Sequence, residues 1–482
     1  MEALVIAFYM IVLGILAVYG FHRALLLFLY WRYRNRAPQP KAHYADADLP
    51  VVTVQLPMFN ELYVAERLID SVAKIDYPKD KLEIQVLDDS TDETQAIARG
   101  RVEALRAEGF LATYEHRVDR TGYKAGALEA GLKVARGDLL MVFDADFVPT
   151  RSIIRDLVHH FTDSNVGMVQ ARWGHINRDY SMLTRVQSMM LDGHFVIEHI
   201  ARNRSGRFFN FNGTAGMWRK AAIVDAGGWQ HDTITEDMDL SFRAQLNGWR
   251  FVYVPTALAP AEIPCEMNSF KTQQFRWAKG SAQTARKLLP MVLRAKLPLK
   301  VKIEAVFHLT NNFAYVFLVI LACLQLPNML LRHEMQSPEL LMLDVPLFAL
   351  TSGSIVLFYL TSHRALYHNV WEAARRLPLM MALAIGLSIN NTRAVLEGLF
   401  GDDVEFIRTP KHGVTSSTHQ WHKAKYRAGK MFHSVVEFCF GLYFVFTIVL
   451  AAITGAWVSI PFLVLFMIGF LYVGSLSLYQ VR

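Results

Sequence analysis

Four short clusters of polar residues have the types and spacing to do chemistry together. Three contain neighbouring carboxylates, Asp88-Asp89, Asp144-Ala145-Asp146 and Glu236-Asp237, and the fourth is Gln273-Gln274-Phe275-Arg276-Trp277. Two carboxylates at i and i+2 in a tight turn can hold a hard divalent cation, which prefers oxygen ligands and usually arrives with substrate phosphates. Alone, Asp144-Ala145-Asp146 fits a solvated acidic turn before a helix equally well. All four clusters in one polar region favour a site for a diphosphate-bearing substrate.

Individual side chains in these clusters suggest separate roles. We expect Asp88 or Asp89 to contact the base or ribose of a bound nucleotide. Lys124 stands at a predicted helix start, where phosphate binds well, although a solvated surface lysine is the alternative. Asp237 is the predicted general base, because one carboxylate within hydrogen-bond reach of a hydroxyl suffices to take its proton. Glu236 or Asp239 is the alternative here, as a charge that stabilises a helix start.

The fourth cluster is expected on a helix. Gln273 and Trp277 share one face at this spacing, and Arg276 lies beside them. The indole offers a flat platform for a sugar ring, while Gln273 and Arg276 offer donors to hydroxyl and phosphate groups. The alternative for Trp277 is an anchor at a membrane interface, because an apolar segment begins soon after it.

Strand and helix patterns alternate through the region that carries the first two clusters. Expected strands are 51–56, 83–87, 111–115, 139–143 and 166–170, and expected helices are 61–75, 92–106, 124–135 and 150–161. This alternation predicts a mainly parallel sheet covered on both faces. Ligands of such sheets bind beyond the carboxyl ends of the strands. Asp88-Asp89 and Asp144-Ala145-Asp146 should therefore face one crevice.

Apolar segments flank this region. The 482 residues are 52% hydrophobic, which is typical of a membrane protein with a water-soluble domain. Expected transmembrane spans, about five, are 4–30, 303–326, 345–360, 432–454 and 456–476. Residues 378–399 include Arg393 and Glu397, which are costly at the bilayer centre, so we expect an amphipathic helix in the cytoplasmic interface. Arg32, Arg34 and Arg36 should hold the end of the first span in the cytosol.

These segments predict six parts in the chain. They are an N-terminal transmembrane helix (1–31), a linker (32–50), a cytosolic domain (51–300), a transmembrane helix pair (301–362), an interface helix with a loop (363–431) and a second transmembrane pair (432–482). The net charge of +7 fits the positive-inside bias of membrane proteins. No basic run interleaved with aromatic residues supports nucleic acid as a partner. Three scattered cysteines imply neither a disulfide framework nor a metal site, and they fit the cytosol.

The order of the motifs resembles that of the processive family 2 glycosyltransferases, which include cellulose, hyaluronan and chitin synthases. The resemblance is closest to the cellulose-synthase-like mannan, glucomannan and glucan synthases, and it covers about residues 51–289. The stretches that carry it are VQLPMFNE (54–61), QVLDDSTD (85–92), GYKAGAL (122–128), FDADF (143–147), VQARW (169–173), FNGTAG (211–216) and EDMDL (236–240).

The resemblance implies an α/β GT-A (Rossmann-like) fold and an inverting hexosyl transfer. The donor would be a nucleotide sugar, UDP-glucose or GDP-mannose, and the acceptor a growing β-linked polysaccharide that the chain passes across the plasma or inner membrane. By resemblance, Asp88 or Asp89 binds the nucleotide, and Asp144 and Asp146 bind the diphosphate and Mg²⁺ or Mn²⁺. Base catalysis falls to Asp237, and residues 273–277 serve the acceptor end and the donor phosphates. Accessory export proteins are further implied partners.

Residues 406–411 resemble the cytosolic gating loop of cellulose synthases, in which Phe, Thr and Lys cover the bound nucleotide. The matching residues are Phe406, Thr409 and Lys411. Arg408 departs from the bacterial cellulose synthase pattern, which has an apolar residue there. Without the resemblance, this segment would be a basic juxtamembrane loop.

Two other functions stay open. A non-processive lipid glycosyltransferase of the ceramide glucosyltransferase type carries a similar Q/R-x-x-R-W ending, and fewer spans would favour it. A transporter or receptor with a cytosolic ligand-binding domain is the other, but it has no need for a third carboxylate beyond a diphosphate site. No residue in the sequence distinguishes glucose from mannose, which differ at one hydroxyl.

Overall fold

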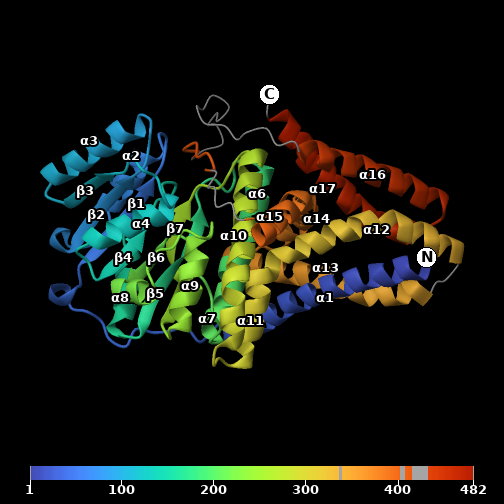
Figure 1. The fold of residues 1–482 in the computed structure, drawn as a ribbon, viewed down its shortest axis with the longest axis horizontal. Coiled ribbons are helices and arrows are strands. Elements are labelled where there is room, and N and C mark those ends of the chain that lie inside the picture. The colour runs from blue at the N-terminus through green and yellow to red at the C-terminus, as the bar shows by residue number, and fades with distance from the viewer. Residues whose placement is uncertain (1, 336–338, 402–407, 415–432, 481–482) are drawn as a thin grey trace.

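The structure is a computed structural model that describes residues 2–335, 339–401, 408–414 and 433–480. An α/β domain and an elongated bundle of helices lie end to end along the long axis of the molecule (Figure 1). The predicted gating-loop residue Phe406 lies outside the described residues.

A seven-stranded sheet forms the centre of the α/β domain, in the order β3-β2-β1-β4-β6-β5-β7. The strands are β1 Val52–Met58, β2 Leu82–Asp88, β3 Leu111–His116, β4 Leu139–Val142, β5 Val166–His175, β6 Gly216–Arg219 and β7 Arg250–Ala261. Strands β1 to β4 are parallel, as are β5 and β7, and only β6 runs antiparallel to its neighbours β4 and β5. The prediction of a mainly parallel sheet is confirmed, with β6 and β7 as strands that the alternating pattern did not reveal.

Helices cover both faces of the sheet. They are α2 Ala65–Ala73, α3 Thr94–Ala107, α4 Tyr123–Val134, α5 Ile153–Val158, α7 His199–Arg204, α8 Lys220–Asp225 and α9 Glu236–Leu246. Helix α6 Met182–Asp192 packs instead against helices of the bundle. On one face, α2, α3 and α5 bury residues such as Leu68 and Val102 against Val54 of β1. On the other face, α4, α8 and α9 pack over β4 and β6, and Leu26 and Tyr30 of the first helix join this core. The α/β domain and the bundle therefore share one apolar core.

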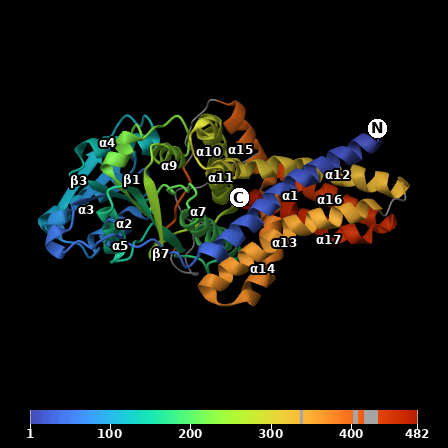
Figure 2. The same ribbon diagram turned by 90° about the horizontal axis from the view of Figure 1, so that it is seen from below.

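The bundle is built from long helices on both sides of the α/β domain in sequence. They are α1 Glu2–Tyr33, α10 Met267–Arg294, α11 Leu299–Thr310, α12 Ala314–Met335, α13 Glu339–Tyr367, α14 Val370–Gly386, α15 Ser388–Phe400, α16 His433–Ile453 and α17 Ile460–Tyr479. Helix α10 packs against α11 and α15 at the boundary between the sheet domain and the bundle, and α1 runs along α12 and α13 (Figure 2).

Four helical segments in the described part of the chain are long and apolar enough to cross a bilayer: Glu2–Tyr33, Leu299–Glu334, His433–Ile453 and Trp457–Tyr479. A fifth results if α14 and α15, which meet at a bend of 44°, form one span. The total of four to five agrees with the expected number of about five. The predicted span 345–360 lies within α13 and stays a prediction.

The predicted interface helix, 378–399, contains the bend between α14 and α15. Helix α14 packs along α17, and the two backbones approach closely at Gly386 and Gly469. A Cβ atom on Gly386 would lie 2.3 Å from the carbonyl oxygen of Gly469. Small residues at such crossings allow the close packing that holds helices together in a bilayer. The interface location of residues 378–399 stays a prediction.

Candidate active site

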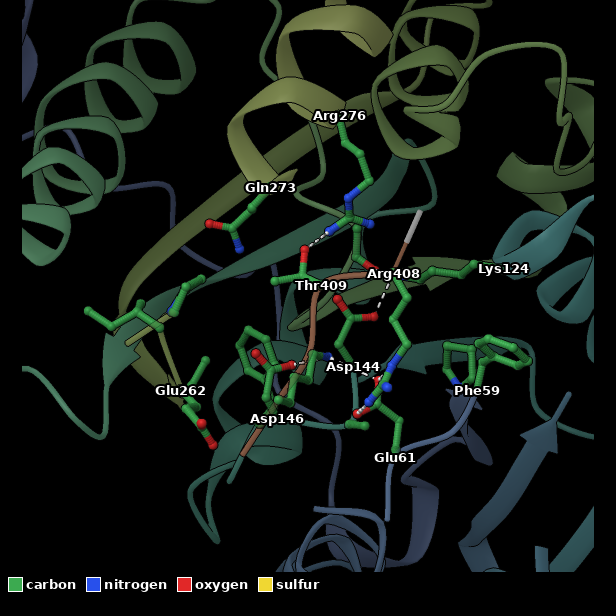
Figure 3. A pocket seen from close by; sticks show the side chains of 18 of the residues that line it. Phe59, Glu61, Lys124, Asp144, Asp146, Glu262, Gln273, Arg276, Arg408 and Thr409 are labelled. Atoms are coloured by element: carbon green, nitrogen blue, oxygen red, sulfur yellow. Dashed lines mark hydrogen bonds and ion pairs between the residues drawn. The ribbon is translucent and has the colours of Figure 1, made fainter. Parts of the chain in front are cut away.

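One cavity of about 200 Å³ opens beyond the carboxyl ends of β1 and β4, between the sheet and α10. Among the described residues, every predicted site residue lines this cavity except Asp88. The side chains come from the ends of strands, the starts of helices α4 and α9, the middle of α10 and the segment 408–414 (Figure 3). The fold therefore brings four separate sequence motifs to one place.

The two neighbouring aspartates after β2 have different environments. Asp88 is fully buried, and its carboxylate accepts hydrogen bonds from the Tyr114 hydroxyl at 2.7 Å and the Ser90 backbone N–H at 2.9 Å. Asp89 lines the cavity, where Arg117 donates to its two oxygens at 2.8 and 2.6 Å. Because Asp89 lines the cavity and Asp88 does not, Asp89 is the member of the pair within reach of a ligand there.

Lys124 lies at the start of α4 and points into the cavity. Its Nζ atom donates to Asp144 Oδ1 at 2.5 Å and to the carbonyl oxygen of Gly213 at 2.8 Å. Burial lowers the pKa of Lys124, but Asp144 and Glu236 outweigh burial, and the net pKa is raised. Lys124 is thus a charged group within the site and not a solvated surface lysine.

Asp146 is reached by the segment 408–414, which crosses the cavity. Lys411 Nζ lies 2.6 Å from Asp146 Oδ1 and 3.8 Å from Glu61 Oε1. Arg408 donates to both Glu61 oxygens, at 3.2 and 2.7 Å (Figure 3). Burial lowers the pKa of Lys411, but Asp146 and Glu61 raise it by more. Three cation–carboxylate contacts therefore hold this segment over the cavity. Arg408, the residue that differs from the bacterial cellulose synthase pattern, pairs with Glu61.

Helix α10 supplies the Gln273, Arg276 and Trp277 side chains, all of which line the cavity. Arg276 Nη2 donates to Thr409 Oγ1 at 2.8 Å, which links α10 to the crossing segment (Figure 3). Burial lowers the pKa of Arg276 to about 10, so its guanidinium stays charged at neutral pH. Since Trp277 lies on the cavity wall, it is placed to contact a ligand there, as the platform role requires.

Asp237 begins α9 beside a tight turn at Gly213. Its Oδ1 atom accepts from the Met238 backbone N–H at 2.8 Å. Burial and the neighbouring Glu236 raise the pKa of Asp237 to about 7. A carboxyl with this pKa exchanges protons readily near neutral pH, as a general base must. Gly213 has φ +79°, and a Cβ atom there would lie 3.1 Å from Asp237 Oδ2, so the turn requires glycine for both reasons.

The donor set of Asp144 and Asp146 fits a divalent cation that arrives with phosphates. Both side chains line the cavity and offer carboxylate oxygens, which hard cations prefer. Within the described ranges, no group of three or more His, Cys, Asp or Glu side chains is arranged to hold a metal ion by itself. Asp144 and Asp146 would hold such a cation together with oxygens of the substrate.

Several residues that line the cavity had no predicted role: Glu61, Trp173, His175 and Glu262. Glu61 follows the end of β1, the same edge of the sheet from which Asp89 and Asp144 project, so the strand-end argument would have found it. Trp173 and His175 lie on β5 beyond its predicted end at residue 170, and Glu262 directly follows β7, which was not predicted. Asn212, which also lines the cavity, belongs to residues 211–216, which the resemblance places near the acceptor terminus.

Comparisons with known proteins agree with this geometry. A family model described as glycosyltransferase like family 2 matches residues 50–280. Glucomannan 4-beta-mannosyltransferase 1 of Oryza sativa subsp. japonica is 36% identical over 403 residues, which are 79% of this chain and 73% of that protein. Glucomannan 4-beta-mannosyltransferase 2 of Arabidopsis thaliana is 34% identical over 414 residues, which are 81% of this chain and 74% of that protein.

A solved structure shares the fold. The mannosyltransferase PcManGT from Pyrobaculum calidifontis, in complex with GDP-Man and Mn²⁺, is 20% identical with a TM-score of 0.52, covering 82% of this chain and all of that chain. At this identity the likeness concerns the fold alone, which is GT-A. The long alignments with the two glucomannan mannosyltransferases carry the assignment further: this chain belongs to the family 2 glycosyltransferases, with cellulose-synthase-like relatives.

Proposed function

We propose that this chain is a membrane-embedded, inverting β-glycan synthase that transfers mannose from GDP-mannose to a growing β-linked polysaccharide. One observation carries the proposal: Asp144, Asp146 and Asp237 converge on one cavity with Arg276 and Lys411. The mannosyl donor is preferred to UDP-glucose because the two curated relatives described above are named as mannosyltransferases.

In the proposed reaction, an acceptor hydroxyl attacks the anomeric carbon of the donor sugar from the face opposite the diphosphate. The new C–O bond forms as the bond to the diphosphate breaks, and the hydroxyl proton passes to the Asp237 carboxylate. Lys411 and Arg276 offer positive charge to the departing diphosphate. A divalent cation held by Asp144 and Asp146 would neutralise the charge that develops there. One displacement of this kind inverts the anomeric configuration.

The acceptor end is assigned to Trp277 and the 211–216 turn. Both border the cavity, and Trp277 lies on α10, the helix that packs against the bundle. A glycan that grows on this platform has its older end directed toward the helices. The arginines after the first span support a cytosolic α/β domain by the positive-inside rule. This arrangement supports sugar transfer and translocation of the glycan by the same chain.

The test uses purified protein in lipid nanodiscs with radiolabelled GDP-mannose and UDP-glucose, each with Mg²⁺ or Mn²⁺. We expect a long product from GDP-mannose that a β-mannanase digests, and no product from the Asp144→Asn variant. A β-glucanase-sensitive polymer from UDP-glucose would instead assign glucose. Single-sugar lipids would establish the ceramide-type alternative, and release of free sugar alone would reject a synthase. Polymer from the purified chain would also mean that synthesis needs no accessory export protein.

A further inference from the structure

The Asn212 side-chain amide lies between two imidazole rings. His199 Nε2 is 2.6 Å from Asn212 Oδ1, and His194 Nε2 is 2.9 Å from Asn212 Nδ2. The two histidines lie on the continuous helical stretch formed by η4, a π-helical turn at Gly193–Glu198, and α7. Asn212 itself lines the cavity. π-helical turns are rare and occur frequently at functional sites, which directs attention to this contact.

Hydrogen-bond chemistry fixes the protons of this arrangement. Glu198 Oε2 lies 2.9 Å from His194 Nδ1, and a carboxylate only accepts, so Nδ1 carries the proton. In neutral His194, Nε2 is then the acceptor for the Asn212 N–H. The Asn212 oxygen must receive its proton from His199 Nε2. The His199 Nδ1 atom is left without a proton, and it is buried without a partner. Burial also holds the pKa of His199 well below its ordinary value, which keeps the ring neutral.

The amide contact controls a turn that touches the reacting groups. Gly213 follows Asn212, and its carbonyl oxygen accepts from Lys124, the lysine paired with Asp144. The same glycine lies against Asp237, and a Cβ atom on it would lie only 3.1 Å from Asp237 Oδ2, so a side chain there would push on the carboxylate. A shift of the turn would therefore move the predicted base and the lysine beside the diphosphate site together.

A buried charge network holds the far side of this contact. Glu198 receives Arg202 Nη1 at 3.0 Å and is also paired with Arg23 of α1. Arg202 Nε reaches Glu304 of α11 at 2.8 Å, and the Glu198, Arg202 and Glu304 side chains are only 9%, 3% and 2% exposed. Charges buried this deeply are costly unless they are fully paired, so the network has one favoured arrangement. Helix α1 ends beside α7, so a predicted membrane span takes part in it (Figure 1).

We propose that His194 and His199 are positioning residues of the transfer reaction. They form hydrogen bonds with both ends of the Asn212 side-chain amide and so hold the Asn212–Gly213 turn in place. This turn contacts Asp237 and Lys124. This inference rests on the proposed transferase function. The histidines touch neither the donor nor the base, and they act through the turn. Glu198, held by the charge network, keeps a proton on His194 Nδ1 and so leaves His194 Nε2 to accept the Asn212 N–H.

The test compares His199→Leu with His199→Gln. Glutamine can place an N–H donor where His199 Nε2 stands, whereas leucine fits the surrounding rings of Phe195, Phe209 and Tyr253 but donates nothing. We expect the leucine variant to lose about tenfold in kcat, the loss that one missing hydrogen bond produces, with the donor KM within about twofold of wild type. The glutamine variant should regain most of kcat. Wild-type kcat in the leucine variant, or equal losses in both variants, would overturn the inference.

A second variant keeps the test decisive if the His199 variants fold poorly. In Asn212→Asp the new carboxylate has no proton to give, so His194 must itself be protonated to bond with it. His194 faces Glu198, with Arg23 and Arg202 behind that carboxylate. We expect kcat of this variant to rise toward acid pH relative to wild type, and an unshifted profile would refute this positioning role. An inactive wild type would instead refute the transferase function itself.

Discussion

Replacing Asp237 by asparagine separates base catalysis from donor binding. The asparagine Oδ1 can still accept the 2.8 Å hydrogen bond from the Met238 N–H, so the start of α9 should be preserved. The substitution removes a carboxylate that can take a proton and deletes one negative charge beside Glu236. Neither change removes a contact that a diphosphate would make. The expected result is therefore a loss of turnover without a loss of nucleotide affinity.

The size of the loss follows from the role. A positioned general base contributes about 10²- to 10⁴-fold to rate, which corresponds to about 3 to 5 kcal/mol of transition-state stabilisation. We expect kcat for Asp237→Asn to fall by that factor. The dissociation constant for the nucleoside diphosphate with its cation should stay within about threefold or tighten, because one repulsive charge in a partly buried cavity is gone.

Kinetics with radiolabelled nucleotide sugar measure kcat, and isothermal titration with the nucleoside diphosphate measures affinity. Asp239→Asn is the matched control. Asp239 lies two residues further along α9 and is fully buried, but it pairs with Arg243 at 2.6 Å and Lys287 at 2.8 Å and does not line the cavity. Its loss should lower stability and leave kcat per folded molecule unchanged. Turnover of Asp237→Asn within tenfold of wild type, or joint loss of turnover and binding, would refute the base assignment.

Four further outcomes are expected. Below pH about 7 the Asp237 carboxylate takes up a proton and cannot act as base, so kcat/KM should fall on the acid side of that value, and Glu236→Gln should move this limb to lower pH in a pH–rate profile. Gly213→Ala should lower kcat at least about tenfold, because the new Cβ would crowd Asp237, and it should also lower the free energy of unfolding by about 1 kcal/mol, because alanine is strained at φ +79°. The side chains of Lys271 and Glu437 pair at 2.7 Å and are both 0% exposed. Replacing only one of them by methionine should lower the free energy of unfolding by about 3 to 5 kcal/mol, because the other charge stays buried and unpaired. The double methionine variant should unfold near the wild-type temperature in a thermal scan in detergent. Chelation by EDTA should abolish transfer, with Mg²⁺ or Mn²⁺ restoring it; activity that persists in EDTA would exclude a metal-dependent step.

The strand ends were the part of the site that the sequence could predict. Short apolar runs located β1, β2 and β4, and the parallel pairing of these strands brings their carboxyl ends to one edge. Asp89 and Asp144 follow those ends, so their meeting needs only local patterns and one topological rule. The same rule does not separate Asp88 from Asp89. Which of them points inward depends on the last residue of β2, and strand ends are uncertain by one or two positions.

Contacts between distant segments were beyond the sequence patterns. Lys411 reaches Asp146, and Arg408 reaches Glu61, only because α10, α15 and the bundle return the chain to the sheet. Strand β6, Gly216–Arg219, is too short to show a periodic pattern, and it is stabilised by pairing with β4 and β5. The histidines around Asn212 lie on a helix with an irregular turn, where side-chain directions do not follow the ordinary helical period. Packing decides these features, and no local propensity encodes them.

The charges of the cavity connect the donor with its cation. The acidic side chains that line the described part of the site slightly outnumber the basic ones: Glu61, Asp89, Asp144, Asp146, Glu236, Asp237 and Glu262 against Arg120, Lys124, Arg276, Arg408 and Lys411. Two arginines outside the lining, Arg117 on Asp89 and Arg67 on Glu262, bring these charges to balance, so a diphosphate entering alone would add negative charge with no cation to match it. A divalent cation that enters with the diphosphate cancels the added negative charge. The carboxylates of the site offer it the oxygen ligands that hard cations prefer. In a partly buried site such imbalances are expensive. The charge arrangement therefore favours joint binding of nucleotide sugar and metal, and it makes the cation part of donor recognition as well as of leaving-group departure.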